Sequence, residues 1–252
     1  MHLVVFDIDG TLTETKGIDE ACFVRAVEDT LSIRVKTDWT VYRDVTDSGI
    51  LAELVESSVG RLPTRVERER VEAQFCELLE VAFAANPRAC LSVGGGPALL
   101  TQLGALDQLA LAVATGGWER SARLKLSRAG YEAEDLVLAS ASDASSRHEI
   151  MVLAKERACA RCGAGEFDSI TYIGDAPWDY EAATALGWGF IGIGRGRSAD
   201  VLKRLGATTI LADFRDPLVL ESQLLGLSGP ESIVQEVDLD LTRSLQARLN
   251  SA

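Results

Sequence analysis

Ten residues near the N-terminus, Leu3-Val4-Val5-Phe6-Asp7-Ile8-Asp9-Gly10-Thr11-Leu12, indicate both the fold and the position of a functional site. The first four are apolar and predict a buried β-strand. Two carboxylates, Asp7 and Asp9, follow at its carboxyl end, where open α/β sheets bind their ligands. An ordinary turn also favours Asp and Gly. However, the four fixed letters of Asp-x-Asp-Gly-Thr occur by chance in only roughly one chain of this length in several hundred, so we interpret the stretch as functional.

Further short apolar runs alternate with helical patterns along the chain, which is typical of a parallel sheet covered by helices. The fold class predicted is therefore α/β, with a Rossmann-like parallel sheet as its core. The predicted strands are Leu3–Phe6, Leu109–Ala114, Leu136–Ala139, Ile170–Ile173, Gly189–Ile193 and Thr209–Leu211. Before the second of them, Pro97 is well placed for the first turn of a helix that reaches Leu106.

The segment from residue 15 to residue 88 differs, because it shows helix-period stripes and no convincing strand. The stripes are Val71, Phe75, Leu78 and Ala82, and Ile50, Leu51, Leu54 and Val55. We therefore predict a core domain of residues 1–14 and 89–227, a helical insertion of residues 15–88, and a C-terminal tail of residues 228–252. The tail has the composition of a short amphipathic helix.

Composition narrows the class of protein. The 252 residues are 47% hydrophobic, enough for a sizeable core. The net charge of −13, from 38 acidic and 25 basic residues, disfavours nucleic acid and anionic membranes as partners. An acidic protein that binds a phosphorylated substrate needs a cation at the site. The five scattered cysteines and the absence of a signal-peptide pattern predict a reduced, cytoplasmic protein, with the Cys159-x-x-Cys162 pair structural rather than zinc-binding.

Two later strands are also followed by polar residues. Thr115-Gly116-Gly117 ends the second strand, where the threonine hydroxyl and the following amides are placed to bind a phosphoryl group. Gly174-Asp175-Ala176-Pro177-Trp178-Asp179 ends the fourth strand. A helix cap explains one of these two aspartates but not both. The carboxyl ends of parallel strands meet at one edge, so these groups are expected beside Asp7.

These motifs resemble those of the haloacid dehalogenase superfamily, whose first motif is a strand followed by Asp-x-Asp-Gly-Thr, and the resemblance extends from Leu3 to about Phe214. It implies that Asp7 is the nucleophile and forms an aspartyl phosphate. Asp9 is then the general acid for the leaving group and afterwards the base for water. A Mg²⁺ ion is expected at Asp7 and Asp9, and the fourth motif implies Asp175 as a ligand and Asp179 as its support.

The third motif of the family is a basic residue at the start of the helix after the third strand, and here the match is imperfect. The familiar Lys-Pro-x-Pro-Asp pattern is replaced by Ser145-Ser146-Arg147-His148-Glu149-Ile150. Arg147 begins that helix and can hold a phosphate through two parallel hydrogen bonds. Lys155, further along the helix, is the alternative, and the sequence leaves the choice between them open.

By the same resemblance, the helical insertion is a cap domain that closes over the active site. Within it, Tyr42 to Ile50 place polar groups between helices, similar to the substrate-facing cap loop of the family. Thr46 and Ser48 are its candidate substrate-binding residues. An ordinary helix N-cap explains the same letters equally well, and both interpretations stay open.

The function predicted is magnesium-dependent hydrolysis of a small phosphomonoester, because dehalogenases of the family typically lack the second aspartate that Asp9 provides. The cap arrangement is similar to that of phosphoglycolate phosphatases and β-phosphoglucomutases. The alternatives are a phosphosugar mutase of the β-phosphoglucomutase type and a non-catalytic binding module with the same fold. The sequence determines neither the particular phosphorylated metabolite nor the oligomeric state.

Overall fold

The computed structural model describes residues 1–226 and has a parallel β-sheet at its centre. The strands are β1 (His2–Phe6), β2 (Leu109–Ala114), β3 (Leu138–Ala139), β4 (Ser169–Gly174), β5 (Gly189–Ile193) and β6 (Ile210–Leu211). Their order in the sheet is β3-β2-β1-β4-β5-β6, and every neighbouring pair is parallel. This is the order of a doubly wound, Rossmann-like sheet, so the predicted fold class is confirmed.

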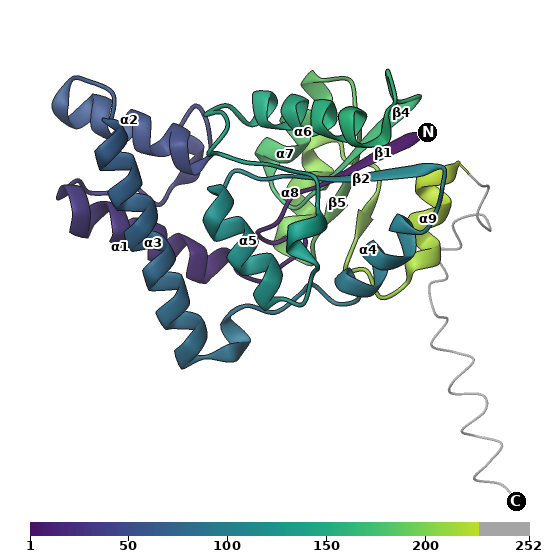
Figure 1. The fold of residues 1–252 in the computed structure, drawn as a ribbon, viewed down its shortest axis with the longest axis horizontal. Helices are drawn as coiled ribbons and strands as arrows, with labels where there is room; N and C mark the ends of the chain where they lie inside the picture. The colour runs from purple at the N-terminus through teal and green to yellow at the C-terminus, as the bar shows by residue number, and fades with distance from the viewer. Residues whose placement is uncertain (227–252) are drawn as a thin grey trace, which may run out of the picture. The chain divides into compact units, whose positions relative to one another are not determined.

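Helices connect the parallel strands, as βαβ crossovers require. They are α4 (Gly96–Gly104), α5 (Glu119–Arg128), α6 (Arg147–Cys162), α7 (Pro177–Ala185) and α8 (Arg197–Leu205). Figure 1 shows α6 on one side of the sheet and α4 and α5 on the other. The strands are covered on both faces, which explains why β1 is an almost uninterrupted run of fully buried apolar residues.

The predicted strands agree with the observed ones to within one residue at each end, except at β3. Predicted as Leu136–Ala139, β3 pairs with β2 only through Leu138 and Ala139. The helix predicted from Pro97 to Leu106 is α4, and it ends at Gly104. In register, Phe6 of β1 lies opposite Val113 of β2 and Ile173 of β4. The residues that follow these three strands therefore begin at nearly the same level of the sheet.

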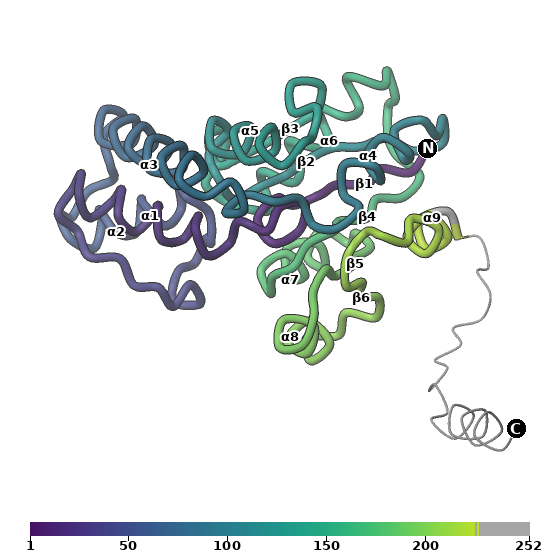
Figure 2. Tube along the Cα trace, turned by 90° about the horizontal axis from the view of Figure 1, so that it is seen from below, coloured from purple at the N-terminus to yellow at the C-terminus, as the bar shows by residue number. Residues whose placement is uncertain are grey.

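The segment between β1 and α4 is helical within the described residues, as predicted. It contains α1 (Lys16–Leu31), α2 (Asp47–Val59) and α3 (Arg65–Ala85), with short 3₁₀ turns at Trp39–Val41 and Pro87–Ala89. Figures 1 and 2 show α1, α2 and α3 together, to one side of the sheet. The α2 stripe is buried as predicted, but in α3 the buried residues after Phe75 are Cys76, Leu79 and Phe83, rather than Leu78 and Ala82.

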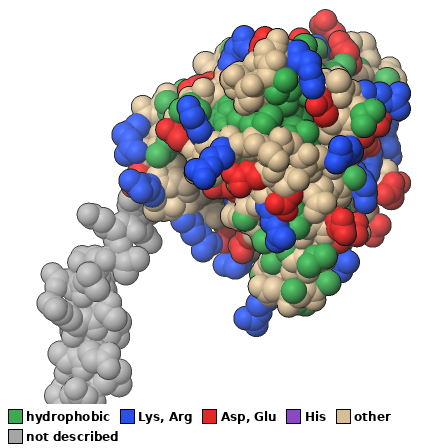
Figure 3. Space-filling view, turned by 90° about the vertical axis from the view of Figure 1, so that its left-hand side faces the viewer, with side chains coloured by type: hydrophobic (Ala, Val, Ile, Leu, Met, Phe, Trp, Pro, Cys, Tyr) green, Lys and Arg blue, Asp and Glu red, His purple; other side chains and the backbone are tan. Residues whose placement is uncertain are grey.

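The outward surface of these helices carries charges of both signs. Figure 3 shows Lys, Arg, Asp and Glu side chains interspersed with hydrophobic ones on this face. On α3, Arg65 and Glu69 form an ion pair of 2.6 Å one turn apart, and Thr64 and Glu67 form a capping box at the helix start. The charge-rich beginning of α3 is therefore a solvated helix face.

Residues 1–217 form one compact unit, and a second begins at Leu218, within α9 (Pro217–Leu225). The helix predicted for the tail, residues 228–252, lies outside the described residues. Within residues 1–226, no helix combines the length and the apolar character needed to cross a membrane.

Cysteine exposure gives a test of this fold. Cys22, Cys76 and Cys90 are buried, and burial raises the pKa of each thiol to about 11. Cys159 and Cys162, in the last turn of α6, are half-buried and exposed. Because the thiolate is the reactive form, iodoacetamide at pH 8 is expected to label only these two quickly in the native protein, and all five after denaturation. Intact mass distinguishes the two results, and rapid native labelling of three or more thiols would contradict the packing.

Candidate active site

The loops that follow β1 and β4 lie against each other at the carboxyl edge of the sheet. The backbone N–H of Asp7 donates to the carbonyl of Ile173 (2.9 Å), which fixes the first aspartate against β4. Gly10 then turns with φ of +92°, a conformation that glycine adopts without strain. A Cβ at this position would lie 2.3 Å from Oδ2 of Asp175. Glycine is thus required here both for the turn and for the close approach of the carboxylate.

Three of the four aspartates predicted as metal ligands form one buried group. Asp7, Asp175 and Asp179 each have a carboxylate oxygen within 4.8 Å of those of the other two. Asp179 is fully buried and accepts hydrogen bonds from the backbone N–H groups of Asp175 (3.1 Å) and Ala176 (3.0 Å). It thereby caps α7 and faces the cluster, so the cap interpretation and the metal interpretation both apply to this residue.

Two basic side chains partly balance this cluster. Lys16, the first residue of α1, places Nζ 2.8 Å from Oδ2 of Asp175. Arg147, the first residue of α6, places Nη1 2.8 Å from Oδ1 of Asp179 and 3.5 Å from Oδ1 of Asp7. Lys155 lies eight residues further along α6, about 12 Å along a helix axis. This geometry favours Arg147 over Lys155 as the basic residue of the third motif.

The buried groups leave unused capacity for a cation and an anion. Oδ1 of Asp179 is ion-paired with Nη1 of Arg147 at 2.8 Å but accepts no hydrogen bond, and Nε of Arg147 donates none within the described residues. Burial, followed by repulsion from Asp179, raises the pKa of Asp7 well above its usual value. Burial also raises the pKa of Asp175 to about 6. Three carboxylates facing two basic side chains thus fit a divalent cation with oxygen ligands.

Asp9 lies outside this cluster. Its Oδ1 accepts a hydrogen bond of 2.6 Å from the hydroxyl of Thr15, and its Oδ2 lies 2.5 Å from Nζ of Lys125. The prediction of its side chain as a fourth member of the metal-binding group is therefore not matched by the arrangement of the described residues. Both donors instead hold the carboxylate next to the cluster, in a position suited to exchanging protons.

Lys125 joins Asp9 to the first turn of α1. It is fully buried, and its Nζ also lies 2.5 Å from Oδ1 of Asp19. Burial alone would lower the pKa of the lysine, but attraction to Asp19 and Asp9 outweighs it and raises the pKa. Burial and repulsion from Asp9 raise the pKa of Asp19 to about 6. Sequence reasoning did not identify Lys125, Asp19 or Lys16.

Thr115 and Gly116 lie where the sequence predicted. Thr115 is buried after β2, and its hydroxyl accepts a hydrogen bond of 3.1 Å from the N–H of Gly117. Gly116 provides space, because a Cβ there would lie 2.5 Å from Nη2 of Arg147 and 3.0 Å from the carbonyl oxygen of Val45. The carbonyl of Gly116 accepts a hydrogen bond of 2.7 Å from the N–H of Asp47. This loop therefore connects the sheet, Arg147 and the start of α2.

The candidate substrate-binding residues of the helical insertion have structural roles. The Thr46 hydroxyl caps α2 by accepting from Gly49 N–H (3.0 Å) and donates to the carbonyl of Ser145 (2.5 Å). The Ser48 hydroxyl donates to the carbonyl of Ala141 (2.6 Å) and accepts from the indole N–H of Trp118 (2.8 Å). Thr46 nevertheless lines the pocket, whereas the hydrogen bonds of Ser48 are made within the protein.

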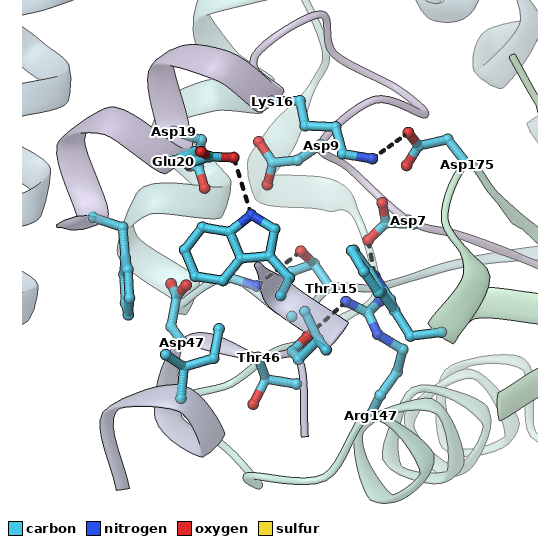
Figure 4. Close-up of a pocket in the computed structure, with 17 residues that line it drawn as sticks. Asp7, Asp9, Lys16, Asp19, Glu20, Thr46, Asp47, Thr115, Arg147 and Asp175 are labelled. Carbon is cyan, nitrogen blue, oxygen red and sulfur yellow. Dashed lines mark hydrogen bonds and ion pairs between the residues drawn. The ribbon is translucent and has the colours of Figure 1, made fainter. Parts of the chain in front are cut away.

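The pocket is a cavity of about 110 Å³ with two differently charged ends. Figure 4 shows Asp7, Asp175 and Arg147 toward one end and Asp19, Glu20 and Asp47 toward the other, with Asp9 between them. Phe23, Trp39 and Ile50 add apolar surface. The arrangement is an α/β site in which the carboxylate of Asp7, at the end of β1, faces the pocket and a second carboxylate, that of Asp9, also lines it.

Comparison with known proteins identifies the family. The family model of haloacid dehalogenase-like hydrolases matches residues 1–187, and the chain belongs to this family. No curated protein matches the chain. A hydrolase from Pseudomonas syringae is similar in fold, with 22% identity, a TM-score of 0.66, and coverage of 91% of this chain and 100% of that one.

Other solved structures share the fold, with similarly low sequence identity and similar TM-scores. The β-phosphoglucomutase of Clostridium difficile has 14% identity and a TM-score of 0.62, covering 87% of this chain and 95% of that one. A mutant of CbbY from Rhodobacter sphaeroides, solved in complex with xylulose-(1,5)bisphosphate, has 18% identity and a TM-score of 0.59, covering 85% and 95%. At these identities the likeness concerns the fold.

Proposed function

We propose that this protein is a Mg²⁺-dependent phosphatase that hydrolyses a small phosphomonoester through an aspartyl phosphate on Asp7. The observation that carries the proposal is the position of Asp7, at the end of β1, within a group of three buried carboxylates and 3.5 Å from Arg147. Asp7, Asp175 and Asp179 would hold Mg²⁺, which when bound shields the charge of the phosphoryl oxygens. The solved structure of CbbY with a bisphosphorylated sugar supports a phosphorylated small molecule as substrate.

The reaction proceeds in two displacements. A carboxylate oxygen of Asp7 attacks phosphorus, the bond from phosphorus to the alcohol oxygen breaks, and protonated Asp9 gives its proton to the leaving alkoxide. Asp9 then takes a proton from water, whose oxygen attacks phosphorus and releases phosphate from Asp7. Arg147 and the amides after Thr115 hold the phosphoryl oxygens in both steps.

The helical insertion supports a second part of the proposal. We assign residues 15–88 as a cap domain over a core formed by residues 1–14 and 89–227, because Lys16, Asp19 and Asp47 all extend from its helices to the pocket. Closure of such a lid excludes bulk water while phosphorus is attacked. A cytoplasmic location stays a prediction from the cysteine pattern.

The test is phosphate release from a panel of small phosphomonoesters, with Mg²⁺ and with EDTA. Hydrolysis of at least one ester that EDTA abolishes and Mg²⁺ restores is the expected result. Equal release in both buffers would eliminate the metal-dependent mechanism. If a labelled phosphoryl group instead returned to the substrate as an isomer, the mutase suggested by similarity to β-phosphoglucomutase would replace hydrolysis.

A further inference from the structure

The position of Asp9 defines the direction in which the leaving group lies. If the phosphoryl group binds between Asp7 and Arg147, the alcohol oxygen must lie toward Asp9, which protonates it. Lys125 ties Asp9 to Asp19 through contacts of 2.5 Å to each carboxylate. Substituents on the alcohol therefore extend toward Asp19, Glu20 and Asp47, which line the other end of the pocket (Figure 4).

That end of the pocket is strongly acidic. Asp9, Asp19, Glu20 and Asp47 all line it. The one basic side chain beside them in the described residues, Lys125, is fully buried and already shared by two carboxylates. Lys16 and Arg147, which also line the pocket, pair with the carboxylates of the opposite end. A carboxylate or second phosphate on the substrate would meet like charges there.

Asp47 adds an unsatisfied acceptor at this end. Asp47 is only 7% exposed, and its Oδ2 accepts a hydrogen bond of 2.8 Å from the backbone N–H of Trp118. Its Oδ1 accepts no hydrogen bond within residues 1–226, although the residue lines the pocket. This oxygen is not among the buried polar atoms that lack a partner, so it is accessible at the pocket and can accept a hydrogen bond from a ligand.

Aromatic rings accompany the carboxylates. Phe23 and Trp39 line the same pocket, with ring centroids 6.4 Å apart and planes at 73°. The indole N–H of Trp39 donates to Oε2 of Glu20 (2.9 Å), which holds that carboxylate beside the ring. Carboxylates combined with aromatic rings are the surroundings that favour an ammonium group, through charge and cation–π attraction.

We propose that the substrate is the phosphate ester of a small amino alcohol, with its protonated amine bound by Asp47, Glu20 and Asp19 against Trp39 and Phe23. The cavity of about 110 Å³ is small beside the roughly 300 Å³ at which ordinary ligand pockets begin, which fits an alcohol of a few heavy atoms better than a large one. This inference rests on the proposed phosphatase function and specifies its substrate class.

The test compares three two-carbon phosphate esters that differ in one group: O-phosphoethanolamine, ethylene glycol monophosphate and phosphoglycolate. With Mg²⁺ present, kcat/KM is expected to be at least about tenfold higher for the amine than for the hydroxyl compound, and lowest for the carboxylate, because a charged hydrogen bond is gained in the first and a like charge is met in the last. Equal values for amine and hydroxyl compounds, or a preference for the carboxylate, would overturn the inference.

Asp47→Asn tests the residue assignment. The amide oxygen can still accept from Trp118, while the charge is lost, so the ratio of kcat/KM for the amine to that for the hydroxyl compound is expected to fall about tenfold. Asp44→Asn, a matched change three residues earlier, just before α2 and outside the pocket lining, is expected to keep the ratio. An unchanged ratio in Asp47→Asn would contradict the assignment.

p-Nitrophenyl phosphate separates this inference from the proposed function. If it is hydrolysed while the amine is not preferred, the substrate class is wrong and the phosphatase stands. If neither it nor any of the three esters is hydrolysed, both fail.

Discussion

Asp7→Asn is expected to reduce phosphate release more than about a thousandfold, because an amide of the same shape cannot attack phosphorus. The substitution keeps the backbone hydrogen bond from Asp7 to Ile173, so the end of β1 should stay in place. Acid-quenched wild type incubated with ³²P-labelled substrate should retain label on the protein, and the variant should retain none. Asp29→Asn, a matched change at an exposed surface pair with Arg25, is the control and should have wild-type rates.

The same variant should be more stable than wild type in metal-free buffer near neutral pH. Burial and repulsion from Asp179 raise the pKa of Asp7 above the usual value of 3.8, although Arg147 opposes the shift. The native state therefore holds its proton more tightly than the unfolded state, and wild type loses stability as the pH rises above that value. Asparagine does not titrate, so the Tm difference should grow with pH.

For the phosphate-release measurement, an Asp7→Asn variant that retained a tenth of the wild-type rate would disprove Asp7 as the nucleophile.

The strands could be predicted because a buried parallel strand is a short apolar run that ends in turn residues. Phe6, Ala114 and Ile173 end the three predicted runs, and the parallel register alone brings Asp7, Thr115 and Asp175 to one edge. β3 was predicted too long because Leu136 and Val137 have the apolar character of a strand, yet only Leu138 and Ala139 are strand residues and Val137 contributes just its carbonyl, which accepts from Val113 N–H (2.7 Å). In α3 the sequence offers Leu78 and Leu79 side by side, and only packing selects Leu79.

Lys125 and Asp19 were missed although the sequence contains a signal for each. Lys125 lies three residues after Ala122 and one before Leu126, on the buried face of α5. Asp19 lies three and four residues before Cys22 and Phe23, on the buried face of α1. A charge on an apolar stripe requires a partner, but periodicity within one helix does not reveal which residue of another helix provides it. Here the two partners are 106 positions apart.

Lys125→Met is expected to lower the free energy of unfolding by about 3 kcal/mol or more, since breaking a buried ion pair leaves uncompensated charge. Asp9 and Asp19, whose side chains are 19% and 17% exposed, would face each other without the lysine between them. Urea unfolding at pH 7 measures the loss. Lys155→Met is the matched control on α6, and Lys155 forms no ion pair within the described residues, so a change below about 1 kcal/mol is expected there.

The variant should also lose activity in a way that simple destabilisation does not explain. Without Lys125, Thr15 is the one remaining side-chain donor to the Asp9 carboxylate within residues 1–226, so proton transfer to the leaving group suffers. An alkoxide leaving group needs that proton, whereas p-nitrophenolate leaves without it. The single-turnover rate should therefore fall roughly tenfold more for alkyl phosphates than for p-nitrophenyl phosphate. Adding Asp19→Asn removes one of the two negative charges that repel each other. It should restore part of the stability, but not the rate on alkyl esters. If both substrate classes slowed equally, Lys125 would have only a structural role.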